Sequence, residues 1–324
     1  MPAVLVTRGV PGPVREHLAE RCRLEVWEGE GVMPRAELLE RVEGKTGLLA
    51  MLTDRVDGEL LDRAGPELAV VANYAVGFDN LDLDACTARG VLATNTPDVV
   101  TEATADLTWA LLLAAARRVA DGDRFLRAGR PWIWGPEFFL GFEVHGKTLG
   151  VIGLGRIGQA VTRRAAGFGM PVLYTARHRL PADEEAALGV AWRELDELLP
   201  EADFVTIHTG LSAATRHLIG ARELARMKPT AVLVNTVRGP IVDEAALAAA
   251  LAAGELGAAG LDVFEHEPEV HPGLLDLDNA TVVPHLGTST LETRVAMGMT
   301  AAANLLAALE GRRPPNLLNP EALG

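Results

Sequence analysis

Residues 153–158 are Gly153-Leu154-Gly155-Arg156-Ile157-Gly158, three glycines in the spacing GxGxxG. An apolar, β-branched run over 148–152 precedes them and a helix-forming run over 159–166 follows, so the sequence predicts strand, tight turn and helix. In that context Gly153 permits a sharp turn, Gly155 leaves room for a pyrophosphate, and Gly158 lets the helix pack closely on the strand. The helix N-terminus adds unpaired N–H groups and a positive dipole end. The motif therefore predicts a dinucleotide-binding unit.

Composition limits the class of protein. The chain has 324 residues, 48% of them hydrophobic, which suits about two domains with sizeable cores. Its formal net charge of -14 argues against nucleic acid or an anionic membrane as a partner. Cys22 and Cys86 are the only cysteines, which indicates a reducing compartment and no structural zinc. The N-terminus reads as a strand without signal-peptide architecture, and the longest apolar run, 107–116, is too short to span a bilayer. We therefore expect a soluble, cytoplasmic protein.

Short apolar runs alternate with helical patterns along the chain, which is typical of βαβ units in mostly parallel sheets. Strands are expected at 3–7, 24–27, 47–52, 68–73, 91–94, 148–152, 171–175, 203–208, 231–235, 257–264 and 281–283. Helices are expected at 13–21, 34–42, 56–63, 83–89, 101–118, 159–166, 195–199, 243–253 and 288–310. The pattern of the long helix 101–118, with Thr101 as its cap, predicts a buried face of Leu107, Ala110, Leu111 and Ala114, and 121–144 is expected to be irregular and aromatic.

The order of these elements predicts an α/β protein of two domains. One is a Rossmann-type doubly wound parallel sheet, and the other is a flavodoxin-like, discontinuous substrate domain. The first block lacks a closing helix, while a long helix follows the last strand of the second block, so we expect the C-terminal segment to return to the first domain. The predicted substrate domain is 1–100 with 287–324, and the predicted dinucleotide-binding domain is 101–286. A ligand is expected between the two, at the carboxyl ends of the strands.

Three polar side chains, Arg238, Glu267 and His285, each follow a predicted strand of the second block. Because the carboxyl ends of parallel strands line one crevice, we expect these side chains to lie close together. A guanidinium matches a carboxylate substrate, and an imidazole beside a carboxylate favours its protonated form. Such a set could protonate a carbonyl oxygen as hydride arrives. Position alone leaves Glu265 open as an alternative to Glu267.

Other catalytic chemistries find little support. The remaining histidines show no ligand spacing such as HExxH, so no metal site is expected. No Gly-x-Ser-x-Gly elbow occurs either, which disfavours a hydrolase.

The turn after the second strand of the glycine unit bears on cofactor choice. A site for NAD places an Asp or Glu about 20 residues after the motif, where this chain has Ala176. Arg177, His178 and Arg179 follow at once. Guanidinium groups form charge-assisted hydrogen bonds to a 2′-phosphate. We therefore expect NADP(H) to be preferred, with NAD(H) still usable.

Four stretches carry a resemblance to a known family: the glycine motif and residues 234–239, 260–268 and 284–287. Together with 73–80 and 95–97 they resemble the D-isomer-specific 2-hydroxyacid dehydrogenases over nearly the whole chain. Residues 52–57 and 173–177 are most similar to the glyoxylate/hydroxypyruvate reductases of that family. The resemblance implies an NAD(P)H-dependent reduction of a small 2-keto acid, such as glyoxylate or hydroxypyruvate, to the 2-hydroxy acid.

The resemblance also implies roles for individual residues. Arg238 would hold the substrate carboxylate and carbonyl, His285 would donate the proton, and Glu267, directly before Pro268, would pair with His285. Substrate-binding positions are Leu52, Val76, Gly77, Arg238 and His285. Cofactor-binding positions are Thr104, Gly153, Gly155, Arg156, Ile157, Gly158, Arg177, His178, Arg179, Thr236, Val237, Arg238, Asp262, His285 and Gly287. One departure is Gly210, where the family usually has proline, and it affects the loop near the adenine side.

A homodimer is expected through the helix 101–118 and the aromatic connection 129–142, because that connection contains unusually many large apolar side chains. The resemblance agrees and implies that an aromatic side chain there, with Trp134 and Phe138 as candidates, caps the partner's substrate pocket. Alternative functions are a phosphoglycerate, D-lactate or formate dehydrogenase, or a dinucleotide-sensing, corepressor-like binding protein. Many phosphoglycerate dehydrogenases carry an extra C-terminal regulatory domain, which we do not expect in this chain because its sequence ends at Gly324.

Overall fold

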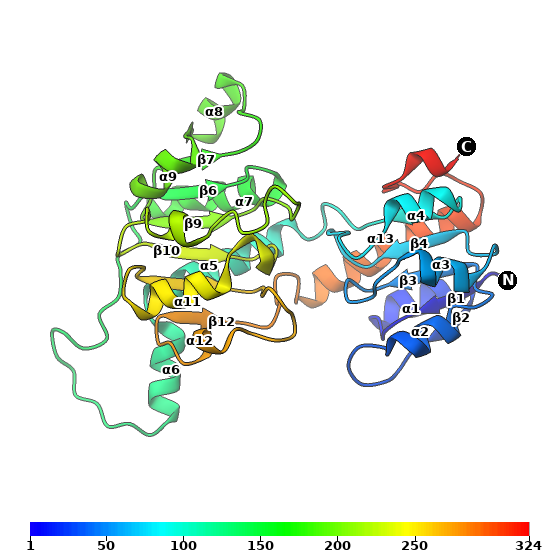
Figure 1. Ribbon diagram of the computed structural model, residues 1–324, viewed down its shortest axis with the longest axis horizontal. Coiled ribbons are helices and arrows are strands. Elements are labelled where there is room, and N and C mark those ends of the chain that lie inside the picture. The colour runs from blue at the N-terminus through cyan, green and yellow to red at the C-terminus, as the bar shows by residue number, and fades with distance from the viewer. Residues whose placement is uncertain (324) are drawn as a thin grey trace. The chain divides into compact units, whose positions relative to one another are not determined.

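The computed structural model describes residues 1–323, which form two compact units. Unit 1 comprises Met1–Val100 and the chain from Ser289 onward, and unit 2 comprises Thr101–Thr288. Each unit is built around one parallel sheet with helices on both faces (Figure 1). The predicted α/β fold class with two parallel sheets is confirmed. The second boundary lies slightly beyond the predicted one at 286/287.

The sheet of unit 1 has five strands in the order β2-β1-β3-β4-β5, all parallel. That order is the one found in flavodoxin-like folds. The strands are β1 (Ala3–Val6), β2 (Arg23–Val26), β3 (Gly47–Ala50), β4 (Val70–Asn73) and β5 (Leu92–Thr94). The helices are α1 (Gly12–Ala19), α2 (Arg35–Arg41), α3 (Gly58–Ala64), α4 (Leu83–Ala88) and α13 (Leu291–Leu309).

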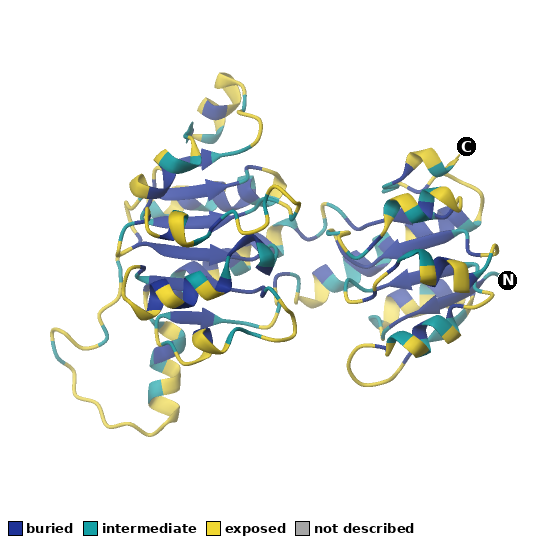
Figure 2. Cartoon of the chain, in the orientation of Figure 1, coloured by how far each residue is buried: buried dark blue, intermediate teal, exposed yellow. Residues whose placement is uncertain are grey.

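Alternate side chains of these strands enter two separate cores. Leu5 packs with the apolar faces of α2, α3 and α4, whereas its neighbours Val4 and Val6 pack with α1 and α13. This alternation follows from the period of two along a strand. Because both faces are covered, the strands β1, β3 and β4 are apolar and almost fully buried, as their dark blue arrows in Figure 2 show, whereas the edge strand β2 carries Arg23 and Glu25 and is only partly buried. The returning helix α13 covers one face of the sheet together with α1.

The sheet of unit 2 has seven parallel strands in the order β12-β11-β10-β9-β6-β7-β8. The chain runs from β6 outward to β8 and then returns to place β9 on the other side of β6, so the topological switch lies between β6 and β9. The strands are β6 (Leu149–Ile152), β7 (Val172–Thr175), β8 (Val190–Trp192), β9 (Phe204–Ile207), β10 (Val232–Asn235), β11 (Ala258–Leu261) and β12 (Ala280–Val282).

Helices cover both faces of this sheet as well. On one side α5 and α7 pack on Leu149, Val151 and their neighbours, and on the other side α9 and α11 pack on Ile152 and Leu233. The helices of unit 2 are α5 (Thr101–Ala116), α6 (Val119–Arg127), α7 (Arg156–Ala165), α8 (Ala182–Leu188), α9 (Leu195–Glu201), α10 (Ala221–Leu224), α11 (Glu244–Ala252) and α12 (Pro272–Leu275). The sequence reading missed α8, β8, α10 and α12. Helices α10 and α12 have only four residues each, about one turn, and the buried residue of α8 is Glu185, so these helices show no apolar period.

Side-chain caps decide where four of the helices begin. Asp57, Asp82, Asp243 and Thr290 each accept a hydrogen bond from the backbone N–H three residues further on, at the starts of α3, α4, α11 and α13. Two of these caps explain why helices expected from 56 and from 288 begin at Gly58 and Leu291 instead.

The predicted buried face of α5 is wrong. Ala110 is exposed, Leu107 and Ala114 are half-buried, and only Leu111 is buried. The helix packs against α7 on one side and against β10 and β11 on another, so its buried arc is centred elsewhere. The buried residues are Thr104, Ala105, Thr108, Trp109, Leu111, Leu112, Ala115 and Ala116. A count of apolar positions missed this arc because threonine lies inside it, with the Thr108 hydroxyl bonded to the Thr104 carbonyl at 2.8 Å. Thr101 is the first residue of the helix and not its cap.

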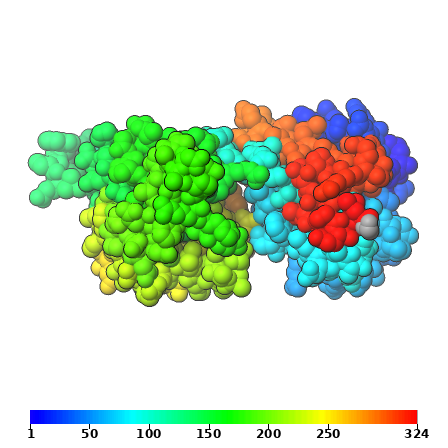
Figure 3. Space-filling view, turned by 90° about the horizontal axis from the view of Figure 1, so that it is seen from above, coloured from blue at the N-terminus to red at the C-terminus, as the bar shows by residue number. Residues whose placement is uncertain are grey.

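The segment 121–144, expected to be irregular, begins inside a helix. Arg118, at φ 53°, separates α5 from α6, and its side chain donates to the Asp121 carboxylate, with the closer contact at 2.5 Å. Beyond α6 the chain is irregular as predicted and projects from the rest of unit 2 (Figures 1 and 3). Within residues 1–323, no helix has both the length and the apolar character that crossing a membrane requires.

Candidate active site

The glycine loop adopts the geometry that its sequence predicts. Gly153 follows β6 with φ 93°, and a Cβ atom there would lie 2.6 Å from the Thr209 nitrogen beyond β9. A Cβ atom on Gly158 would lie 2.2 Å from the Gly153 carbonyl oxygen. The protein itself therefore requires glycine at both positions, because the neighbouring atoms are backbone.

Gly155 differs from the other two glycines. It is the N-cap residue of α7, and a Cβ atom on it would meet no atom of residues 1–323 within 4 Å. Open space in front of this backbone, at the N-terminus of a ten-residue helix, is where an anionic ligand can approach closely. Arg156 is the first residue of that helix, and Ile157 packs against the core beneath it. These residues fit a dinucleotide pyrophosphate.

The three candidate catalytic residues come from three neighbouring strands. Arg238 follows β10, Glu267 follows β11 and His285 follows β12, and these strands lie side by side in the sheet. Oε2 of Glu267 lies 2.8 Å from Nδ1 of His285. The charge of Arg238 also acts on Glu267. Burial raises the pKa of Glu267, but the hydrogen bond and charge of His285 outweigh it and hold that pKa below its usual value.

Glu265, the alternative acid, has other partners. Its carboxylate lies 2.6 Å from Nε2 of His217 and accepts from the Arg216 guanidinium at 3.2 Å. Its backbone N–H donates to the Glu244 carboxylate at the start of α11. The geometry therefore places Glu267 beside His285 and commits Glu265 to the support of the loop. Sequence position could not separate them because both follow the same strand.

The backbone of His285 is strained, and hydrogen bonds to Asp262 hold its loop in place. Its φ of 52° lies in the left-handed region, which costs a residue other than glycine about 1–3 kcal/mol. Its N–H donates to the Asp262 carbonyl at 2.9 Å. The buried Asp262 carboxylate accepts from the N–H groups of Leu286, at 2.5 Å, and Gly287, at 2.8 Å. Burial raises the pKa of Asp262 to about 6, against the effect of these hydrogen bonds. Asp262 thus fixes the loop that carries the histidine.

Other predicted cofactor positions gather at the same loop. The Thr104 hydroxyl donates to the Gly287 carbonyl at 3.4 Å, and a Cβ atom on Gly287 would lie 3.1 Å from Oδ2 of Asp262. The Thr236 hydroxyl lies 2.9 Å from that of Thr108 on α5. Val237 donates its N–H to the Asn235 side chain at 3.1 Å. The structure therefore brings together Thr104, Asp262 and Gly287, with Thr236 held against α5.

A close backbone contact joins the loops of Arg238 and Glu267. A Cβ atom on Gly239 would lie 1.8 Å from the Phe264 carbonyl carbon, so only glycine allows the two loops to touch. The side-chain amide of Asn235 donates to the Arg238 carbonyl at 2.9 Å. The spacing between the guanidinium and the carboxylate therefore depends on Gly239, a role that the sequence reading did not assign.

In unit 1 the predicted substrate-binding residues lie in loops held by asparagines. Asn73 donates its amide to the Gly77 carbonyl at 2.8 Å, and Asn95 donates to the Val76 carbonyl at 2.8 Å. Leu52 lies in the turn after β3, where the buried Asp54 carboxylate accepts from the Met51 N–H at 2.7 Å. The sequence reading missed these asparagines as anchors, although the quoted stretches 73–80 and 95–97 contain them.

The two arginines of the basic turn after β7 differ in the structure. Arg177, His178 and Arg179 are all exposed, but Arg179 also forms two hydrogen bonds with the Glu185 carboxylate, at 2.8 and 2.9 Å. Arg179 also lies over the Trp192 ring, 5.5 Å from its centre. The sequence reading treated the arginines alike and did not single out Glu185.

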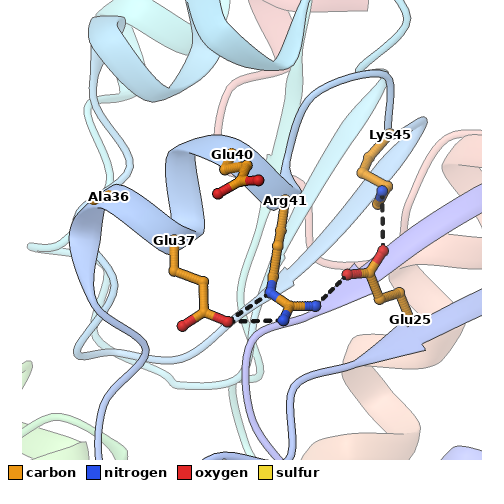
Figure 4. A pocket seen from close by; sticks show the side chains of 6 residues that line it. All are labelled: Glu25, Ala36, Glu37, Glu40, Arg41 and Lys45. Atoms are coloured by element: carbon orange, nitrogen blue, oxygen red, sulfur yellow. Dashed lines mark hydrogen bonds and ion pairs between the residues drawn. The ribbon is translucent and has the colours of Figure 1, made fainter.

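A separate hollow lies on unit 1 beside α2 and contains no candidate catalytic residue. Arg41 binds Glu25 at 2.7 Å and Glu37 at 2.8 Å, and Lys45 binds Glu25 at 3.1 Å (Figure 4). Figure 4 also shows Ala36 and Glu40 at its wall. Because four of its charges neutralise one another, we interpret this hollow as an ion-pair network that joins α2 to β2.

Comparison with known proteins shows which family this chain resembles. Residues 109–287 match the family described as D-isomer specific 2-hydroxyacid dehydrogenase, NAD binding domain. The glyoxylate reductase of Thermococcus onnurineus is 48% identical over 99% of this chain and 97% of its own length. The glyoxylate reductase of Pyrococcus furiosus is 47% identical over 99% and 96%.

Solved structures agree with these relatives. The TT0316 protein of Thermus thermophilus superposes with a TM-score of 0.92 at 48% identity, over 98% of this chain and 99% of that one. An NADPH-dependent glyoxylate/hydroxypyruvate reductase of Sinorhizobium meliloti, solved with NADP and malonate, gives 0.84 at 32% identity, over 99% and 97%. The chain therefore belongs to the D-isomer-specific 2-hydroxyacid dehydrogenase family, and the resemblance seen in the sequence is confirmed.

Proposed function

We propose that this chain reduces small 2-keto acids of the glyoxylate and hydroxypyruvate type to their 2-hydroxy acids, with NADPH as the preferred reductant. The observation that carries the proposal is the pairing of His285 with Glu267, 2.8 Å apart, within range of the Arg238 charge. Relatives named glyoxylate reductase support the substrate class, and a relative solved with NADP supports the cofactor class. We assign unit 2 to the cofactor and unit 1 to the substrate.

Each of the three proposed catalytic residues has its own role. Arg238 binds the substrate carboxylate, because its planar fork matches two oxygens. Glu267 accepts from Nδ1 of His285, which orients the ring and leaves Nε2 to protonate the carbonyl oxygen. A bound nicotinamide supplies the hydride. Leu52, Val76 and Gly77 complete the proposed substrate contacts.

The proposed cofactor contacts extend from the glycine loop to the histidine loop. Gly155 and the N-terminus of α7 receive the pyrophosphate, as the open backbone there allows. Arg177, His178 and Arg179 form the basic turn beside the ribose. The remaining contacts are Thr104, Gly153, Arg156, Ile157, Gly158, Thr236, Val237, Arg238, Asp262, His285 and Gly287.

An activity assay tests the proposal. Purified enzyme is given glyoxylate, hydroxypyruvate, pyruvate or phosphohydroxypyruvate, each with NADPH or NADH, and the loss of reduced cofactor is followed by absorbance. We expect the highest kcat/KM with glyoxylate or hydroxypyruvate. A clear preference for phosphohydroxypyruvate or pyruvate would favour a phosphoglycerate or lactate dehydrogenase. Tight nucleotide binding without turnover would favour a sensing protein.

Replacing Arg177 by alanine is expected to reduce the preference for NADPH. Arg177 is exposed on the turn after β7, with no carboxylate paired to it within residues 1–323, so its charge is available to a 2′-phosphate. A hydrogen bond to a charged group is worth about 1.5–3 kcal/mol, which corresponds to roughly tenfold to a hundredfold in selectivity. The measurement is kcat/KM with each cofactor in the wild type and the variant. Unchanged selectivity, or a wild type that prefers NADH, would contradict the prediction.

We expect a homodimer that uses the long helix predicted at 101–118, which corresponds to α5, and the aromatic segment 129–142. The side chains of Ile133 and Trp134 are 88% and 77% exposed there, an apolar surface that a monomer rarely leaves in water. Phe125 packs edge-on against Phe138 and Phe139 and anchors the segment to α6. Sedimentation at micromolar concentration should give twice the chain mass, and replacing Ile133 and Trp134 by serine should lower the association constant. A monomeric wild type would exclude this assembly.

A further inference from the structure

Glu185, on α8, is a buried acid that the proposed chemistry does not use. Only 8% of the residue is exposed, yet it carries a charge. Buried charges need partners, and Glu185 has two. Arg179 donates to both of its oxygens, at 2.8 and 2.9 Å, and the Tyr174 hydroxyl donates to Oε1 at 2.8 Å. These hydrogen bonds lower the pKa of Glu185 to about 2, so the group is ionised at any neutral pH.

The Tyr174 hydroxyl connects this carboxylate to the backbone of the basic turn. Tyr174 is the penultimate residue of β7, its side chain is fully buried, and its oxygen accepts from the Leu180 N–H at 2.8 Å. The end of the turn is thus tied back to the strand from which the turn starts. Arg179, one residue earlier, is tied by its side chain to the same carboxylate.

The beginning of the turn is held as well. Thr175 pairs with Ile152 in the sheet, and its carbonyl accepts from the Gly153 N–H in the glycine loop at 2.8 Å. Both ends of the segment 175–180 are therefore fixed, one to the glycine loop and the other to Glu185 through Tyr174 and Arg179. The residues between them, Arg177 and His178, are exposed at the tip.

We propose that Glu185 is a positioning residue for cofactor selectivity, which holds Arg179 and Leu180 so that the turn presents Arg177 to the 2′-phosphate. In this arrangement Arg179 supports the turn, while Arg177 contacts the ligand. Fixing the turn in advance removes the entropy that its ordering would otherwise cost on binding. The inference deepens the proposed NADPH preference and rests on it.

The test uses Glu185→Gln and Tyr174→Phe in the full chain. Binding of adenosine 2′,5′-bisphosphate and of AMP is measured by calorimetry, because these two probes differ only in the 2′-phosphate and require no turnover. Each variant should lower the ratio of the two affinities by about three- to tenfold, the range for one lost hydrogen bond. Selectivity between NADPH and NADH in kcat/KM should fall in parallel, while the KM for glyoxylate at saturating NADPH stays unchanged.

Asp203→Asn is the matched control. Like Glu185, Asp203 is a carboxylate that pairs with a basic side chain, Lys228 at 2.7 Å, and it accepts a second hydrogen bond, from the Thr148 N–H at 2.9 Å. It lies at the amino end of the same sheet, away from the basic turn. It should lower the melting temperature without changing the affinity ratio. An unchanged ratio in Glu185→Gln would leave Glu185 a purely structural role. An increased ratio would mean that freed Arg179 is itself the phosphate contact. Either result overturns the proposal. A wild-type enzyme that binds the two probes with the expected preference but reduces no 2-keto acid would count against the proposed reaction instead.

Discussion

Replacing His285 by alanine is expected to lower kcat for 2-keto acid reduction by about a hundredfold or more. A positioned general acid contributes about 10²–10⁴-fold to a rate, and His285 is held for this role by its 2.8 Å contact with Glu267. The loss should appear in kcat with a smaller change in KM, because the substrate carboxylate is assigned to Arg238. Steady-state kinetics with glyoxylate and NADPH measure both. The affinity for NADPH, followed by fluorescence, should fall far less than kcat, because His285 is only one of many proposed cofactor contacts, and this separates lost chemistry from lost folding.

Glu267→Gln serves as the graded companion to this variant. The amide keeps the shape of the side chain but removes the negative charge that lies 2.8 Å from Nδ1 of His285. Its kcat should lie between those of the wild type and His285→Ala. Near-normal turnover in His285→Ala would remove the histidine from the mechanism.

The alternation of strands and helices was predictable because buried parallel strands are apolar runs and amphipathic helices repeat at their own period. The glycine loop was predictable in more detail. Gly158 is required by the nearby carbonyl oxygen of Gly153, and Gly153 is required by the backbone of Thr209 just beyond β9. The buried face of α5 was not predictable from the sequence, because α7 buries one side of the helix and β10 and β11 bury another. Thr104 and Thr108 also lie inside this face, where their hydroxyls are hydrogen-bonded.

The candidate active site was likewise predictable only in part. That Arg238, Glu267 and His285 would meet followed from the rule that parallel strands end at one edge, and the geometry agrees with it. Which of two glutamates faces the histidine depended on His217 and Arg216, distant in sequence, which bind Glu265. The separation of Arg177 from Arg179 likewise depended on Glu185, the buried residue of a helix that shows no apolar face in the sequence. Partners that come from elsewhere in the chain are what the sequence could not reveal.

Arg238→Lys is expected to lower kcat/KM for glyoxylate by about a hundredfold, although the charge is kept. The guanidinium can donate two parallel hydrogen bonds to a carboxylate, whereas an ammonium acts as a point charge with freely rotating donors. The loss of a charge-assisted hydrogen bond costs about 1.5–3 kcal/mol, and the misplacement of the substrate relative to His285 adds to it. The loop itself should persist, because the Asn235 amide holds the Arg238 backbone carbonyl and not its side chain. A much larger rise in the KM for glyoxylate than in the KM for NADPH would support a substrate role. If the lysine variant kept wild-type kinetics, the fork geometry of Arg238 would have no part in substrate binding.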